Sequence, residues 1–261
     1  AAPDGTFAYF GLLAGDQTSL ATAISADGQT VVGYSRRDDA TQRERAFIWT
    51  PTGGTRQIPD LRPNGVFTQA RGVSASGEFV VGHSNSDSIF APPSAFIWSA
   101  ATGSVELPGF APGDTSEARG VAAAGTIVVG YSDLRAARWT NGVIEDLGLL
   151  PGYTIGASAN YVSNDGSLIA GSINAPSATG LLNTSFVFSD SRGMQLANDF
   201  FAGHGVVLPG TIFAITDMSP DGTAFSVRLY DSFADYVVVI PAAPSALAFA
   251  ILLAAPFRRR R

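Results

Sequence analysis

Hydrophobic and polar residues follow one another in short runs along this chain, and the same succession of runs returns several times. The first copy reads AISADGQTVVGYS, followed after a charged loop by RAFIW, and it occupies residues 23–49. Further copies occupy residues 72–98, 120–139 and 161–188, and a degenerate fifth copy begins at Asp217. Self-similarity at a period near 50 residues is typical of propellers and solenoids. The pattern therefore predicts an array of like units.

Each copy contains four short stretches that suit β-strands. The first stretch ends, in successive copies, at Ile24, Val73, Val121 and Val162. In the first copy the other three are predicted over residues 30–35, 46–50 and 56–61. An Asp-Gly pair stands between the first two stretches at residues 27–28, 165–166 and 221–222. Such a pair supplies the positive φ of a tight hairpin turn, so we expect these two strands to pair antiparallel.

Two residue types recur inside the strands and predict how the copies pack. A glycine inside each second strand indicates a bulge or the close approach of another backbone. These glycines are Gly33, Gly82, Gly130 and Gly171. Large aromatic residues at the end of each third strand are expected to fill the space between neighbouring sheets. They are Trp49, Trp98, Trp139 and Phe188. A lone sheet with apolar residues on both faces would lose ~25 cal/mol per Å² exposed, so neighbouring copies must cover one another.

The two ends of the array predict how it closes. Residues 10–15, FGLLAG, match residues 147–152, LGLLPG, which end a fourth strand, whereas the fifth copy stops after its third strand at residue 240. We therefore predict an all-β, five-bladed β-propeller of ~48-residue repeats over residues 1–240, with residues 7–13 completing the last blade. An open solenoid, which would need polar caps, and a β-sandwich, which would need no repeats, are the alternatives.

The composition limits which partners the protein can be expected to bind and which chemistry it can perform. The net charge is −6, and four of the 16 basic residues are the terminal arginines, so the body of the chain is more acidic still. An acidic body repels phosphate backbones, and nucleic acid is not an expected partner. Without cysteine the chain has no disulfide, thiolate metal site or Cys nucleophile. It begins with AAPDG and not with Met, which suggests a removed signal peptide.

The combined motif GLLPG, ISADGQTVVGYS and RAFIW resembles the extracellular HAF repeat of bacterial surface and secreted proteins, over roughly residues 7–240. The turn, the VVG segment and the aromatic end recur in this order in four copies. The resemblance implies an extracytoplasmic, propeller-like array. It brings no established reaction.

The C-terminal residues 241–261 read PAAPSALAFAILLAAPFRRRR and predict a short hydrophobic helix. The apolar stretch is shorter than the ~20 residues of a comfortable membrane span, but a basic end favours an orientation with that end in the cytoplasm. Arg258, Arg259, Arg260 and Arg261 form this membrane-stop segment. The alternative, a further strand of the last blade, conflicts with three prolines in the stretch.

This layout resembles the PEP-CTERM sorting signal, which combines a short proline motif, a hydrophobic helix and a basic end. Pro241, Pro244 and Ser245 stand at the position of the motif. The resemblance implies processing by an exosortase-type enzyme, transient anchoring in the membrane and a place at the cell surface or in the exopolysaccharide.

Five polar residues hold one register, two positions before the end of each first strand. They are Thr22, Arg71, Arg119, Asn160 and Thr216. If the first strand is innermost, these side chains ring a central channel, and two guanidinium groups could bind an anion or an acidic sugar. The alternative is that the two arginines pair with carboxylates such as Glu117 or Asp217.

No motif of the sequence predicts catalysis, a metal or a cofactor. His83 stands where other copies have tyrosine, and His204 lies in an insertion before the fifth copy; neither accompanies a nucleophile elbow or a zinc motif. Five loop aspartates lack the spacing of a calcium loop and are expected to serve turns. They are Asp16, Asp27, Asp114, Asp165 and Asp221. We expect a binding or structural protein; the alternative is an enzyme that acts on polysaccharide through paired carboxylates on a propeller face.

Overall fold

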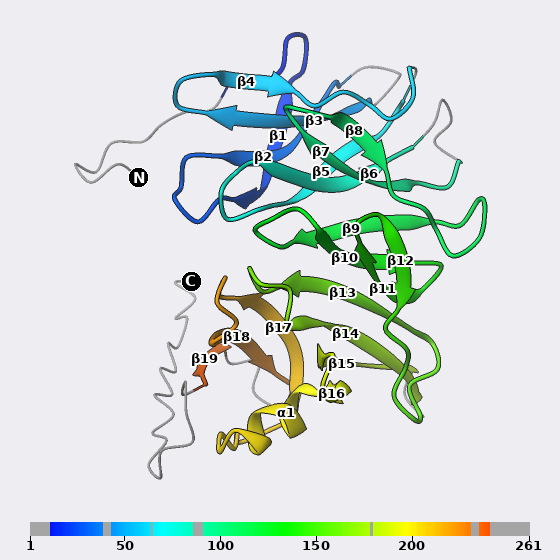
Figure 1. Cartoon of the computed structure of the whole chain (residues 1–261), viewed down its shortest axis with the longest axis vertical. Coiled ribbons are helices and arrows are strands. Elements are labelled where there is room, and N and C mark those ends of the chain that lie inside the picture. Colours follow the sequence, from blue (N-terminus) through cyan, green and yellow to red (C-terminus); the bar gives the residue numbers. More distant parts are fainter. Residues whose placement is uncertain are drawn as a thin grey trace, which may run out of the picture. The chain divides into compact units, whose positions relative to one another are not determined.

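The structure is a computed structural model, and it describes residues 11–38, 43–63, 65–85, 91–177, 180–230 and 235–240. In this part of the chain nineteen strands and one short helix form (Figure 1). The chain divides into two compact units, residues 1–118 and residues 119–261.

The first unit contains two antiparallel sheets of four strands, each with its strands in chain order. The first sheet consists of β1 (Thr18–Ile24), β2 (Val31–Arg36), β3 (Glu44–Thr50) and β4 (Gly54–Gln57). The second sheet consists of β5 (Thr68–Val73), β6 (Phe79–Ser84), β7 (Ser94–Ser99) and β8 (Gly103–Glu106).

The second unit contains three further antiparallel sheets in chain order. The third sheet consists of β9 (Ser116–Val121), whose first residues belong to the first unit, β10 (Ile127–Ser132), β11 (Arg135–Thr140) and β12 (Val143–Asp146). The fourth consists of β13 (Gly156–Val162), β14 (Ile169–Ser177), β15 (Gly180–Ser189) and β16 (Gly193–Leu196). The helix α1 (Ala197–Gly203) leads to the fifth sheet, with β17 (Ile212–Met218), β18 (Ala224–Leu229) and β19 (Asp235–Val239).

Five successive antiparallel sheets of this kind confirm the predicted class, a five-bladed β-propeller. The first strands β1, β5, β9 and β13 end at the predicted residues. The fourth strand of the first copy was predicted over residues 56–61 but spans Gly54–Gln57. Its ladder ends early because Pro59 has no backbone N–H, although the N–H of Ile58 still donates to the carbonyl of Ala46 at 2.9 Å.

The predicted hairpin turns are present between the first two strands. Gly28, Gly166 and Gly222 have φ values of +70°, +77° and +70°. The turns of successive repeats also bond to one another within each unit. In the first unit the N–H of Ala26 donates to Ala75 O at 3.1 Å, and in the second unit the N–H of Asn164 donates to Pro220 O at 2.6 Å. The repeated turn therefore links sheets as well as strands.

Three of the four glycines of the second strands, Gly33, Gly82 and Gly171, face β-bulges, as predicted. The register of β1 with β2 shifts between Ala21 and Ala23, and corresponding shifts occur in β5 and β13. A Cβ placed on Gly33 would lie 2.0 Å from the carbonyl oxygen of Leu20. The same test gives 1.9 Å at Gly82 and 2.1 Å at Gly171. Only glycine leaves room for the carbonyl that the bulge turns toward the partner strand.

Buried side chains of neighbouring sheets share their cores within each unit. One cluster joins Val32 and Ile48 of the first sheet to Val80 and Phe96 of the second. A cluster of the second unit joins the third and fourth sheets in the same way. This arrangement confirms that the copies cover one another's apolar faces.

The aromatic core differs in part from the prediction. Trp139 is fully buried, but Trp49, Trp98 and Phe188 are only half-buried. The fully buried rings lie two residues earlier along the same strand face, at Phe47, Phe96 and Phe186. In β11 this position is held by Ala137, and the smaller side chain there accompanies the deeper burial of Trp139. Interiors are packed to nearly constant density, so a volume lost at one position is filled from the next.

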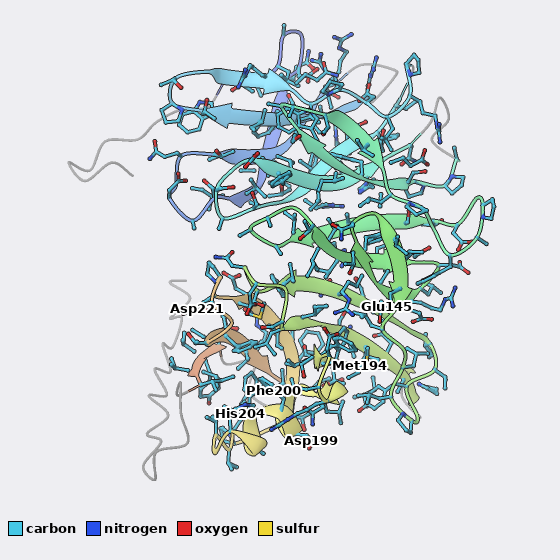
Figure 2. The ribbon with its side chains drawn as sticks, viewed as in Figure 1. Glu145, Met194, Asp199, Phe200, His204 and Asp221 are labelled. Carbon is cyan, nitrogen blue, oxygen red and sulfur yellow. The ribbon has the colours of Figure 1, made fainter. Side chains whose placement is uncertain are left out.

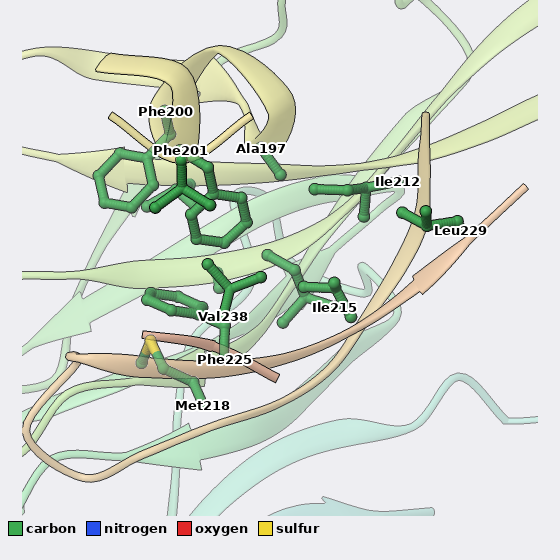
Figure 3. Packing of buried hydrophobic residues seen from close by; sticks show 13 residues of the cluster. Ala197, Phe200, Phe201, Ile212, Ile215, Met218, Phe225, Leu229 and Val238 are labelled. Atoms are coloured by element: carbon green, nitrogen blue, oxygen red, sulfur yellow. The ribbon is translucent and has the colours of Figure 1, made fainter. Parts of the chain in front are cut away.

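The helix α1 covers the core between the fourth and fifth sheets. Its Phe200 and Phe201 are buried in one cluster with Phe225, Ile215 and Val238 (Figure 3). The rings of Phe201 and Phe225 meet edge to face with centroids 5.1 Å apart. Such contacts contribute beyond the area they bury.

Two predictions fall wholly or mostly outside the described residues. The whole C-terminal segment 241–261 lies outside the described residues, and so do residues 7–10 of the predicted closing strand. Gly11–Leu13, the rest of that predicted strand, are described but lie in no strand. The fifth sheet has three strands among the residues described. Closure by the N-terminal strand stays a prediction. No helix in the described ranges has the length and apolar character needed to span a bilayer.

Candidate functional site

The five polar residues of the predicted channel belong to the first strands, and four of them lie at bulges. Thr22, Arg71 and Asn160 are the extra residues at the register shifts of β1, β5 and β13. Thr216 is the extra residue of β17, between Ile215 and Asp217. A bulge re-aims the side chain of its extra residue, so one backbone device sets the direction of these four groups.

In the first unit the two members of this set have intramolecular partners. Thr22 Oγ1 donates to the carbonyl of Ala70 at 2.8 Å. Arg71 Nε lies 3.2 Å from Glu117 Oε1, and the Glu117 side chain is buried. The alternative that Arg71 pairs with Glu117 is therefore correct.

In the second unit the polar residues of this set also have intramolecular partners. Arg119 Nη1 donates to Asn160 Oδ1 at 2.9 Å, and its guanidinium lies 5.2 Å from the centre of the Tyr131 ring. Thr216 Oγ1 donates to the carbonyl of Ser226 at 3.2 Å. Arg71 and Arg119 belong to different units, so an anion site that uses both stays a prediction.

Tyr161 connects two bulges of the second unit. Its hydroxyl donates to the carbonyl of Thr216 at 2.5 Å. Burial raises the pKa of the Tyr161 phenol above its ordinary value, and the carboxylate of Asp217 raises this pKa further. The phenol is therefore a neutral donor over the physiological pH range.

One contact of the first unit has no signal in the sequence. His83 is predicted to be a plain strand residue, but its Nδ1 lies 3.4 Å from Glu117 Oε2, with only 10% of its side chain exposed. The buried carboxylate thus lies between an imidazole and the guanidinium of Arg71. The contact joins β6 to the start of β9, and no local spacing reveals it.

His204 contacts the end of the helix α1 and has a structural role there. Its Nδ1 lies 2.8 Å from the carbonyl of Phe200, and its ring packs at 4.5 Å on the ring of Phe200 at the end of α1 (Figure 2). The described residues contain no group of three or more His, Asp or Glu side chains that could hold a metal ion.

Three of the five loop aspartates hold the hairpin turns between the first two strands. Asp165 Oδ1 accepts hydrogen bonds from Ser163 Oγ at 2.6 Å and from the N–H of Ser167 at 3.0 Å. Asp221 accepts the equivalent pair from Ser219 and Thr223, and Asp27 from Ser25 and Gln29. The predicted turn role is confirmed for these three aspartates.

A cavity of about 600 Å³ lies in the first unit, where β8 leads into the loop before β9. Its charged lining residues are Arg62, Glu106 and Asp114, and Phe110 contributes an aromatic wall. Arg62 Nη2 lies 3.1 Å from both carboxylate oxygens of Glu106. Asp114 Oδ2 accepts the N–H of Ala111 at 2.8 Å.

No family model matches the chain, and no curated protein matches it. Solved structures do share its fold. The β-propeller domain of Cps50 (Swd1) from Myceliophteria thermophila is similar with a TM-score of 0.54 at 12% identity, over 92% of this chain and 72% of that one. The likeness extends to the fold alone.

Two proteases contain similar domains. Prolyl oligopeptidase B from Galerina marginata has a TM-score of 0.55 at 11% identity, over 88% of this chain, and the tricorn protease has 0.51 at 13% identity, over 90%. This chain covers 33% of the former and 24% of the latter. Both likenesses support the β-propeller assignment.

Proposed function

We propose that this protein is a non-catalytic repeat protein that works outside the cytoplasm and binds or supports a partner at the cell surface or in the matrix. The observation that supports this most is the use of the repeated polar residues. Those that recur in the sequence form turns, bulges and internal ion pairs, as Asp165, Thr22 and Arg71 illustrate. Repetition here maintains the fold, and recognition is left to the loops and faces that differ between copies.

The proposed location rests on the sequence resemblances to the HAF repeat and to the PEP-CTERM signal. The segment with Pro241, Pro244 and Ser245 would be processed by an exosortase-type enzyme, and Arg258–Arg261 would hold the end of the chain at the cytoplasmic face. An apolar stretch this short gives a transient anchor. Exopolysaccharide is then a neighbour that the protein meets.

Fractionation of the producing bacterium tests the location. The full chain is expected in the envelope fraction, and a chain that ends at residue 240 in the periplasmic or culture fluid. A matched variant with all four terminal arginines replaced by glutamine keeps the apolar stretch and should lose its fixed orientation. Recovery of all three forms from the cytoplasm would contradict the proposal.

The alternative function, an enzyme that acts on polysaccharide, has one favourable observation. Glu106 and Asp114 line the same cavity, and glycosidases use two carboxylates in one cleft. However, Arg62 contacts both oxygens of Glu106, which suits a fixed ion pair better than a proton donor. Incubation with exopolysaccharide and assay of new reducing ends separates the two functions. Release that Glu106→Gln abolishes would establish the enzyme; no release is expected.

A further inference from the structure

The loop before the first strand of each of the first four repeats contains the same tight turn. In each turn the N–H of the fourth residue donates to the carbonyl of the first residue, over 3.0 to 3.2 Å. The first residues of the four turns are Leu13, Arg62, Ala111 and Leu150. Three of these residues are apolar and only Arg62 carries a charge, so the second repeat departs from the other three at this position.

The fourth strand of the second repeat ends with the partner of this arginine. Glu106 lies opposite Phe96 in the second repeat, as Gln57 lies opposite Phe47 in the first. Arg62 Nη2 lies 3.1 Å from both carboxylate oxygens of Glu106, with 51% of the arginine side chain and 43% of the glutamate side chain exposed. An ion pair this exposed contributes at most about 1 kcal/mol to stability. The fold itself therefore has little need of the pair.

The pair has hydrogen-bonding capacity to spare. Within the ranges that the structure describes, no hydrogen bond or ion pair engages the Nε or Nη1 group of Arg62. A carboxylate offers about two lone pairs on each oxygen, so each oxygen of Glu106 can accept a further donor beside Nη2. Donors and acceptors thus stand side by side at the end of β8.

Both residues line the cavity of the first unit, whose volume of about 600 Å³ lies within the range of small-ligand pockets. Backbone hydrogen bonds hold the strand ends that bear its lining. The N–H of Leu107 donates to Ala95 O and the N–H of Ser116 donates to Pro93 O, both at 2.8 Å. Prolines restrict the backbone of the two lining loops further. They are Pro92, Pro108 and Pro112. A site that is fixed in advance loses less conformational entropy when a ligand binds.

The lining combines polar groups with apolar surface. Arg62, Glu106 and Ser94 supply donors and acceptors, while Phe110 and the three prolines supply apolar surface. The charged lining residues are one arginine and two carboxylates, Glu106 and Asp114, so their net charge is negative. An acidic ligand would be repelled by this charge, and a basic ligand would meet the guanidinium of Arg62.

We propose that this cavity binds one unit of a neutral sugar chain. A sugar hydroxyl both donates and accepts hydrogen bonds, so neighbouring hydroxyls can accept from Nε and Nη1 of Arg62 while they donate to Glu106. The C–H groups of a sugar ring form an apolar face that can pack on the apolar part of the lining. A neutral ligand that carries both kinds of surface matches the cavity in charge and in chemistry.

This inference deepens the proposed function by naming the class of partner, and it rests on that function only for the source of the sugar. Purified protein binds a sugar irrespective of where the cell places the chain. Failure of the titration described next would leave the proposed location intact, and failure of the fractionation would leave the cavity intact.

NMR titration of the isotope-labelled full chain with three neutral disaccharides tests the proposal. Cellobiose, lactose and mannobiose are the probes, because their hydroxyl groups differ in stereochemistry. We expect at least one of them to shift the amide signals of residues 107–114, with a dissociation constant on the order of 1–10 mM. The acidic twin of that sugar, with a carboxylate in place of one CH₂OH group, should bind at least ~10-fold more weakly because the cavity already carries a negative charge.

Arg62→Leu is the decisive variant, since leucine is the residue that the same turn has at Leu13 and Leu150. It removes the donors and should weaken sugar binding ~10-fold or more. Glu106→Gln should weaken binding ~3-fold or more and serves if Arg62→Leu does not fold. Arg56→Leu makes the same exchange at an exposed arginine of β4 that does not line the cavity, so it is the matched control and should change nothing.

No binding of any of the three disaccharides at ~50 mM, well above the expected dissociation constant, would overturn the proposal. Equal binding of the acidic twin would overturn it as well. Unchanged binding by a folded Arg62→Leu protein would place the sugar elsewhere and have the same consequence. The peptide acetyl-Ala-Pro-Ala-amide is titrated in parallel, and a shift of the same signals by this peptide but by no sugar would make the cavity a peptide site instead.

Discussion

The third and fourth repeats turn the chain between their first two strands in the same way, but with different side chains. In the fourth repeat Ser163 donates to Asp165 at 2.6 Å, whereas the third repeat has Ala122 and Ala124 at these positions. The backbone is nevertheless the same. The glycine N–H donates to the carbonyl three residues earlier, at 2.9 Å in the fourth repeat and 3.0 Å in the third. Glycine and strand pairing therefore set the turn, and polar side chains only add to it.

If steric room for the backbone matters more to stability than side-chain hydrogen bonds do, substitution of a bulge glycine should cause the largest loss of stability. A Cβ on Gly171 would lie 2.1 Å from Ser158 O and 2.7 Å from Phe186 Cε1, both in a packed sheet. Gly171→Ala is expected to lower the free energy of unfolding by about 3 kcal/mol or more. Urea unfolding followed by tryptophan fluorescence measures it. Gly148→Ala, at φ +81° with open space around it, is the control and should cost about 1 kcal/mol.

Substitution of a turn glycine should give the next largest loss of stability, because the new side chain would strain the backbone dihedral but would not clash with a neighbour. Gly28 has φ +70°, and a Cβ placed there would meet nothing within 4 Å, so only the left-handed conformation opposes substitution. Gly28→Ala is expected to cost about 1–2 kcal/mol in the same unfolding experiment. Asparagine tolerates this conformation, so Gly28→Asn should cost clearly less. Equal losses for the two variants would show that something other than φ decides.

Exchanging side chains between the two turns tests the smaller contribution. Ser163 Oγ donates to Asp165 and accepts the N–H of Leu168 at 3.0 Å. Ser163→Ala should therefore cost about 1 kcal/mol. The reverse exchange in the third repeat, Ala122→Ser with Ala124→Asp, should add about 0.5 kcal/mol at neutral pH. A loss on the reverse exchange would mean that the two backbones differ more than their hydrogen bonds indicate.

The architecture could be predicted because it repeats in the sequence. Five copies of the repeat indicate the number of sheets. A glycine that recurs inside strands indicates a bulge or a close approach, both of which occur at Gly33 and its equivalents. The depth at which individual aromatic rings are buried was harder to predict from the sequence. The fully buried rings lie at Phe47 and Phe96, not at the tryptophans two residues later. The sequence cannot distinguish the two positions, because residues two apart in a strand share a face and differ only in how deeply they are buried.

Of the candidate site, only the strand positions of the polar residues could be predicted from the sequence. The polar residue of each first strand could be located from the repeat, but its partner comes from another strand or another copy. The pairing of Arg71 with Glu117 is one of two alternatives that the sequence leaves open, while the approach of His83 to the same carboxylate has no signal there. The cavity of the first unit could not be foreseen, because its lining residues Ser94 and Asp114 come from neighbouring repeats and no spacing in the sequence brings them together.

The smallest expected effect concerns pH. The pKa of Asp165 is lowered from its ordinary value, first by the hydrogen bond from the Ser163 hydroxyl and then by those from the N–H and hydroxyl of Ser167. A depressed carboxyl pKa contributes stability that is fully present above the unfolded-state value of about 3.9 and is lost as the pH falls through the folded-state value. The pKa values of Asp27 and Asp221 are lowered for the same reason.

The stability difference between the natural protein and Asp165→Asn should therefore be constant from pH 7 to about pH 5 and shrink below about pH 4. Urea midpoints at several pH values measure it. Ala124→Asp combined with Ala122→Ser should give the third repeat the same acid dependence, which the natural turn lacks because neither alanine titrates. A difference that stays constant down to about pH 3 would show that the hydrogen bonds of Asp165 do not depend on its charge. In that case the alanine turn and the aspartate turn would be equivalent in acid as well as in backbone.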